Sequence, residues 1–138
     1  MIGTVTRKII AFGLIVCALV VTGCGSGNER AYTIHGTFTL ISAQLGGEHG
    51  CWGAAESGFS DIGAATQVIV KNENGTLIGS GSLGPGRKER QVECLFSFTI
   101  SGLPKARFYG IAVSHRGEQD ESFQDLVKSN WNVNLTLG

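Results

Sequence analysis

The sequence predicts an all-β fold, a small antiparallel β-sandwich of about six or seven strands with one short helix near the C-terminus, preceded by a signal peptide. Short runs of alternating apolar and polar residues begin at residue 31, and Gly, Asn and Pro separate them. A parallel sheet would need interleaved helices, and the pattern lacks them. A chain of 138 residues suits a single domain. We expect a signal peptide at 1–23, a flexible tether at 24–30 and the sandwich at 31–138.

Six runs have the period-2 alternation of half-buried strands. The second and third runs flank Asn74-Gly75, a favoured hairpin turn because both residues accept positive φ. Gly84-Pro85-Gly86 closes the third run and Gly102-Leu103-Pro104 ends the fourth. The expected strands cover residues 32–40, 66–71, 76–83, 94–100, 107–115 and 131–137.

One segment, residues 122–129, has a helical pattern instead. Its apolar residues Phe123, Leu126 and Val127 stand at positions i, i+3 and i+4. Ser122 precedes them as an N-cap residue. We therefore expect a short helix just before the last strand.

The first residues have the pattern of a secretory signal. Arg7 and Lys8 stand in a segment without acidic residues, and an apolar run follows at residues 9–21. The run has 13 residues, whereas a membrane-spanning helix needs about 20. The pattern therefore predicts a cleaved signal peptide rather than a permanent transmembrane helix.

The end of the apolar run is Val21-Thr22-Gly23-Cys24, which resembles a bacterial lipobox. That resemblance implies cleavage before Cys24 and two or three acyl chains on it, whereas one chain alone would hold a protein only reversibly. A plain signal peptide with a chance cysteine is the alternative. The lipobox predicts a protein anchored by its lipid to the extracytoplasmic face of the cell membrane.

The charge balance restricts the partners. Eleven cations and eleven anions give a net charge of zero, which argues against nucleic acid as a partner. Cleavage would remove Arg7 and Lys8 and leave a net charge of −2. The whole domain then has no electrostatic attraction to anionic lipid, so the acyl chains must supply the attachment.

The four cysteines have different expected fates. Cys17 would leave with the signal peptide and Cys24 is the acylation candidate. Cys51 and Cys94 would reach a compartment that permits disulfides, and a bridge between them is the simplest expectation. The alternatives are two free thiols or a metal or nucleophile site that includes His49; a zinc site, however, favours C-x-x-C pairs, which are absent.

The longest irregular stretch, residues 46–65, is the candidate binding loop, because loops on rigid scaffolds commonly bind ligands. Its candidate residues are Glu48, His49, Trp52, Glu56 and Asp61.

The acids of this loop raise a calcium hypothesis, in which Glu56 and Asp61 act together with Asp120 and Glu121. The chain has no D-x-D-x-D-G spacing, so no metal site is assigned. The alternative is a solvated loop pinned by Cys51, with Phe59 and Ile62 in the core. Trp52 and Trp131 are either exposed recognition aromatics or, as is commoner for tryptophan in a small sandwich, core residues.

No catalytic residue is predicted. The histidines are His35, His49 and His115, and the chain contains no G-x-S-x-G motif. The basic segment 87–90 is expected to be a solvated hairpin tip or, alternatively, a contact for an acidic partner. We expect a protein that is not an enzyme and that needs no cofactor.

One resemblance rests on several segments of the expected sandwich: residues 51–53, 58–62, 66–70, 81–84, 94–98, 114–117 and 131–138, together with Gly75. These segments resemble a group of actinobacterial, mycobacterial-type, secreted or lipid-anchored proteins. The resemblance covers residues 36–138 and implies an envelope location and a small β-sandwich, and it carries over no catalytic residue. The hairpin around Asn74-Gly75 is similar, more loosely, to transthyretin-like sandwich modules.

The expected function is therefore a non-catalytic, lipid-anchored envelope module that binds a protein or a glycan through loops at one end of the sandwich. A calcium-dependent binding module is the first alternative. An envelope hydrolase that uses His115 or His49 is the second.

Overall fold

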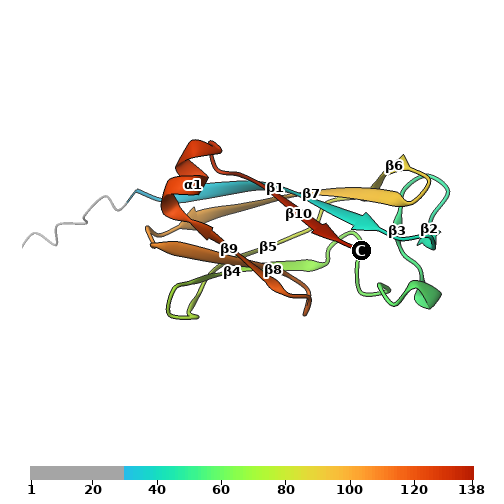
Figure 1. Ribbon diagram of the computed structural model, residues 1–138, viewed down its shortest axis with the longest axis horizontal. Coiled ribbons are helices and arrows are strands. Elements are labelled where there is room, and N and C mark those ends of the chain that lie inside the picture. Colours follow the sequence, from blue (N-terminus) through green and yellow to red (C-terminus); the bar gives the residue numbers. More distant parts are fainter. Residues whose placement is uncertain (1–29) are drawn as a thin grey trace, which may run out of the picture.

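The computed structural model describes residues 30–138, so the expected signal peptide, Cys24 and most of the tether lie outside the described residues. Two four-stranded sheets pack face to face, with one short helix near the C-terminus (Figure 1). The predicted all-β sandwich with a C-terminal helix is confirmed, and each of the six expected strands is present.

The first sheet has the strand order β10-β1-β7-β6 and the second has the order β5-β4-β8-β9. The first consists of β1 (Tyr32–Ile41), β6 (Arg87–Arg90), β7 (Glu93–Leu103) and β10 (Asn132–Leu137). The second consists of β4 (Gln67–Asn72), β5 (Leu77–Ser82), β8 (Phe108–Val113) and β9 (Glu118–Ser122). The remaining elements are the two-residue strands β2 (Leu45–Gly46) and β3 (Trp52–Gly53), the 3-10 turn η1 (Ala55–Ser57) and the helix α1 (Phe123–Lys128).

Strand β10 gives the first sheet one parallel pair. It lies parallel to β1, with His35 opposite Asn132 and Leu40 opposite Leu137, whereas the other strand pairs are antiparallel. The chain leaves the second sheet at the end where β1 begins, and α1 carries it across to the first sheet (Figure 1). Strand β10 must therefore run in the same direction as β1.

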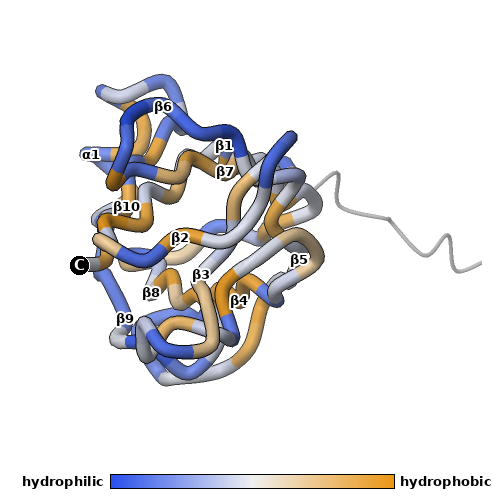
Figure 2. Tube along the Cα trace, turned by 90° about the vertical axis from the view of Figure 1, so that its right-hand side faces the viewer, coloured by the Kyte–Doolittle hydropathy of each residue, from blue (hydrophilic) through white to orange (hydrophobic). Residues whose placement is uncertain are grey.

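The core lies between the two sheets. Alternate residues of β1, β4, β7 and β10 contribute to it, whereas residues 109–113 of β8 are all buried. In Figure 2 the hydrophobic segments of the two layers face each other, while β6 is hydrophilic. Gly36 makes room for a core ring, because a Cβ atom there would lie 1.9 Å from Phe98 Cζ. Burial of each large apolar side chain contributes about 1.5–3 kcal/mol. The largest fully buried side chains include Ile34, Leu40, Ile62, Phe96, Ile100, Leu103, Tyr109, Ile111 and Leu126.

The helix begins as expected, with Ser122 Oγ accepting a hydrogen bond from the Asp125 backbone N–H at 3.1 Å. Its buried apolar face is narrower than the i, i+3, i+4 spacing of its apolar residues predicted. Leu126 is 1% exposed, Phe123 is half-buried and Val127 is 49% exposed. The helix has six residues, and of its apolar side chains only Leu126 and part of Phe123 pack against the core.

The hairpin between β4 and β5 is confirmed, although its turn differs from the expected one. Gly75 has a φ of 74°, whereas Asn74 is not among the residues with positive φ. The turn is longer because Asn72 Oδ1 accepts hydrogen bonds from the backbone N–H groups of Asn74 and Thr76, both at 3.0 Å. Glycine alone supplies the left-handed conformation here.

The two ends of the sandwich differ in what they carry. The chain enters at the end that holds α1 and the start of β1, which we call the tether end (Figure 1). The opposite end, which we call the far end, holds β2, β3, η1 and the turn between β6 and β7 (Figure 1). The candidate binding loop is therefore at the far end.

Candidate functional site

A disulfide anchors the candidate loop to the first sheet. Cys51 and Cys94 are bonded, with their Cα atoms 5.7 Å apart, and their side chains are 2% and 0% exposed. The Cys51 backbone N–H also donates to the carbonyl of Gly86 at 3.2 Å. The predicted bridge is confirmed, so neither cysteine is a free thiol or a metal ligand.

Trp52 lies exposed at the far end on a platform of glycines. A Cβ atom on Gly46 would lie 2.3 Å from Trp52 Nε1, and one on Gly47 would lie 2.8 Å from the same ring. The indole is 50% exposed, so Trp52 is a surface residue. Trp131 differs, because it is partly buried and stacks on Tyr32 with ring centroids 4.5 Å apart.

Asp61 has a structural partner 55 residues away. Arg116 donates to both of its carboxylate oxygens, with an Nε–Oδ2 distance of 3.0 Å. The same guanidinium donates to the Gly58 carbonyl at 2.8 Å and lies 5.3 Å from the Phe59 ring centroid. Hydrogen bonding from Arg116 lowers the pKa of Asp61 from 3.8 to about 2. This ion pair fixes the candidate loop to the turn between β8 and β9.

Replacing Asp61 by Asn is expected to lower the free energy of unfolding by about 2 kcal/mol at pH 7, the equivalent of the pKa shift. The folded-state pKa is depressed, so the stabilisation is present above the unfolded pKa of 3.8 and is lost as the pH falls through about 2. Urea denaturation of both proteins at several pH values measures it. A stability difference that stays constant between pH 7 and pH 2 would contradict this role of Asp61.

Glu48 and His49 form a cleft together with the segment that follows Pro85. The cleft has a volume of about 570 Å³ and is also lined by Arg87 and Lys88. The sequence singled out both segments, but separately, and nothing in their spacing indicated that they meet. The disulfide and the contact between Cys51 and Gly86 bring them together.

The four acids of the calcium hypothesis lie on three different segments of the fold. Glu56 is exposed on η1, Asp61 is paired with Arg116, and Asp120 and Glu121 lie on β9. Within residues 30–138, no three His, Cys, Asp or Glu side chains group in a way that could hold a metal ion.

Three polar side chains meet at the β8–β9 turn. His115 Nδ1 lies 3.0 Å from Ser114 Oγ, and His115 Nε2 lies 3.9 Å from Asp61 Oδ2. The second distance exceeds a hydrogen bond, and Arg116 already occupies the Asp61 carboxylate. The arrangement therefore does not orient the imidazole as a base for Ser114. The sequence placed His115 at the end of a strand, whereas β8 ends at Val113 and His115 lies in the turn that follows.

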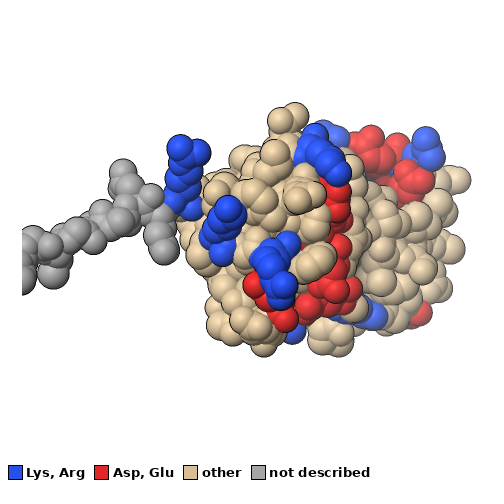
Figure 3. Space-filling view, turned by 60° about the vertical axis from the view of Figure 1, so that its left-hand side comes forward, with Lys and Arg blue, Asp and Glu red and all other residues tan. Residues whose placement is uncertain are grey.

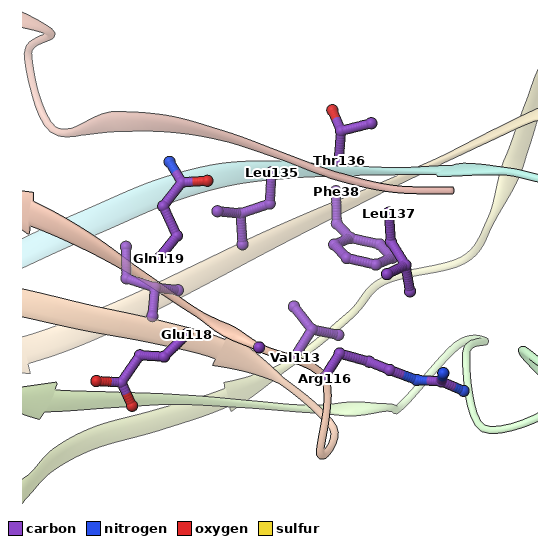
Figure 4. Close-up of a pocket in the computed structure, with 10 residues that line it drawn as sticks. Phe38, Val113, Arg116, Glu118, Gln119, Leu135, Thr136 and Leu137 are labelled. Carbon is purple, nitrogen blue, oxygen red and sulfur yellow. The ribbon is translucent and has the colours of Figure 1, made fainter.

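A groove opens between the two sheets where β9 and β10 form their edges, with a volume of about 270 Å³. Figure 4 shows Phe38, Leu135 and Leu137 pointing from one sheet towards Val113 of the other. Arg116 and Glu118 lie at its rim. Nothing in the sequence indicated this groove, because it depends on which strands occupy the sheet edges. Its apolar walls suit an apolar side chain and present no nucleophile.

No protein family, curated protein or solved structure matches this chain. None of the helices in residues 30–138 is long and apolar enough to cross a membrane.

Proposed function

We propose that this chain is a non-catalytic binding module of the cell envelope, anchored to the membrane by lipid on Cys24, which binds a protein or a glycan with its far end. One observation carries the proposal: the candidate loop and the point where the tether enters lie at opposite ends of the sandwich (Figure 1). An anchored sandwich would then present this loop away from the membrane.

The tether keeps the domain close to the membrane. The seven residues 24–30 can span at most about 25 Å when fully extended. The first strand begins at Tyr32, so the tether end stays within this range of the lipid. Only the far end projects freely towards other envelope components.

The far end carries exposed apolar side chains of the kind that form interface cores. Ile41, Trp52 and Val92 are 41%, 50% and 42% exposed. The Ser42 N–H donates to the Val92 carbonyl at 2.8 Å, which places Ile41 and Val92 close together. Exposed charged and polar residues, Glu48 and His49, lie at the same end. Protein interfaces combine apolar and aromatic side chains with polar ones, so the presence of both kinds at one end of the sandwich suits a binding surface.

Covalent and ionic contacts hold this end in place before any partner binds. The Cys51–Cys94 disulfide fixes one side of the loop, and the ion pair between Asp61 and Arg116 fixes the other. A preorganised surface loses less conformational entropy on binding. Rigid anchoring of so long a loop therefore supports a binding role.

Site-specific photo-crosslinking in the native envelope tests the proposal. A photoreactive residue at His49 on the far end is expected to give one discrete adduct, and Trp52→Ala should weaken it several-fold. The matched control is the same residue at Gln124, which is also exposed but lies on α1 at the tether end. Identical adducts from both positions, or an adduct unaffected by Trp52→Ala, would count against binding through the far end.

A further inference from the structure

We propose that the tether end of the sandwich is a docking surface for anionic lipid headgroups, which orients the anchored domain on the membrane. The surface consists of Arg30, Lys105, Arg107, Phe108 and Phe123, and we call it the headgroup surface. The inference rests on the proposed anchor at Cys24.

Two neighbouring hollows form this surface and share Lys105. One has a volume of about 330 Å³ and is lined by Arg30, Tyr32, Pro104 and Lys105. The other, of about 510 Å³, includes Lys105, Arg107, Phe108 and Phe123. Cationic side chains thus stand beside aromatic rings in both hollows.

Two of the cations are available for an anion. Within residues 30–138, neither Arg30 nor Lys105 takes part in an ion pair, and Lys105 Nζ lies 5.1 Å from the Phe123 ring centroid. Arg107 contacts Glu73 at 3.4 Å, but its side chain is 80% exposed. Figure 3 shows cationic side chains spread over this end of the domain, with acidic side chains directly beside one of them.

A buried tyrosine fixes the turn that carries Lys105 and Arg107. The Tyr109 hydroxyl donates to the Pro104 carbonyl at 2.9 Å and accepts from the Ala106 N–H at 2.9 Å. Tyr109 itself is 0% exposed. Both cations are therefore presented from a defined turn rather than from a loose loop.

The occupant follows from the position of the tether and from charge. The described chain begins at Arg30, within the surface itself, and Cys24 is six residues earlier. Phe108 is 46% exposed, and an exposed apolar ring of this kind can insert at the boundary between headgroups and acyl chains. Each Lys or Arg near an anionic membrane strengthens the association about fivefold. The mature net charge of −2 does not remove the local attraction. The acids at this end are already paired, Glu73 with Arg107 and Asp125 with Lys128.

Lysine footprinting of the acylated protein in vesicles tests the proposal. We compare vesicles with and without phosphatidylglycerol, and follow modification by a water-soluble amine reagent with mass spectrometry. Lys105 should be modified several-fold more slowly in the anionic vesicles, and high salt should remove the difference. Lys88, exposed on β6 at the far end, is the internal control and should react equally in both. The double variant Arg30→Glu/Arg107→Glu should abolish the protection of Lys105.

Equal modification of Lys105 in both vesicle types, whether fast or slow, would overturn the proposal. Slow modification in both would assign the surface to another occupant, such as a second copy. Flotation of the same vesicles tests the anchor separately. If the protein does not float, the anchor fails. The headgroup surface is then tested by co-sedimentation of the unacylated chain with anionic vesicles at low salt. Lys105→Glu should lower the bound fraction about fivefold relative to Lys88→Glu, and equal fractions would overturn it.

Discussion

Replacing Cys51 and Cys94 together by alanine is expected to lower the free energy of unfolding by about 4 kcal/mol. The bridge joins residues 43 apart in the sequence, so its loss frees a long segment of the unfolded chain. Both side chains are buried, so alanine is used rather than serine, which would leave a buried hydroxyl group. Urea denaturation of the oxidised protein and the double variant measures the effect.

Loss of the disulfide should destabilise the far end more than the rest of the sandwich. In the double variant, the hydrogen-exchange rates of the backbone amides are expected to increase most around positions 51 and 52, because the bridge holds their loop on β7. Cys24→Ala, which leaves the bridge intact, is the control and should keep the stability of the natural chain. An unchanged denaturation midpoint in the double variant would contradict this role of the disulfide.

Replacing Cys24 by alanine is expected to move the protein almost completely out of the membrane fraction. Each buried methylene contributes about 0.8 kcal/mol, and two acyl chains anchor a protein stably. Without the acyl chains, the contacts with the membrane would be those of the headgroup surface, which carries only a few cations. Fractionation with detection of the protein measures the change.

The chain offers a matched control for this experiment. Cys17 lies inside the apolar run of the expected signal peptide, and Cys17→Ala should leave the membrane fraction unchanged. Retention of the Cys24→Ala protein in the membrane would contradict lipid anchoring through this residue. Release of the Cys17→Ala protein would do so as well.

Much of the fold was predictable because alternation of apolar and polar residues reports directly on which strand faces are buried. Strand β7 shows this, since its even-numbered residues from Cys94 to Ile100 are buried. Strands β6 and β9 were missed because they are edge strands with exposed charged residues. Charge protects such edges against pairing with other chains and also hides the strand pattern.

The site was less predictable because it depends on contacts between distant segments. Asp61 was a candidate calcium ligand from its loop alone, whereas its partner Arg116 is 55 residues later. The cleft around His49 requires the neighbouring turn at Pro85. The groove at β9 and β10 requires the parallel pairing of β10 with β1, and local periodicity says nothing about strand order.

The orientation of the sandwich, the reach of the tether and the headgroup surface all depend on a lipid at Cys24. The most direct measurement is the mass of the N-terminal peptide of the protein purified from the membrane fraction. We predict a peptide that begins at Cys24, lacks residues 1–23 and carries two or three acyl chains on that cysteine. A peptide that begins at another residue, or an unmodified Cys24, would contradict the lipid anchor.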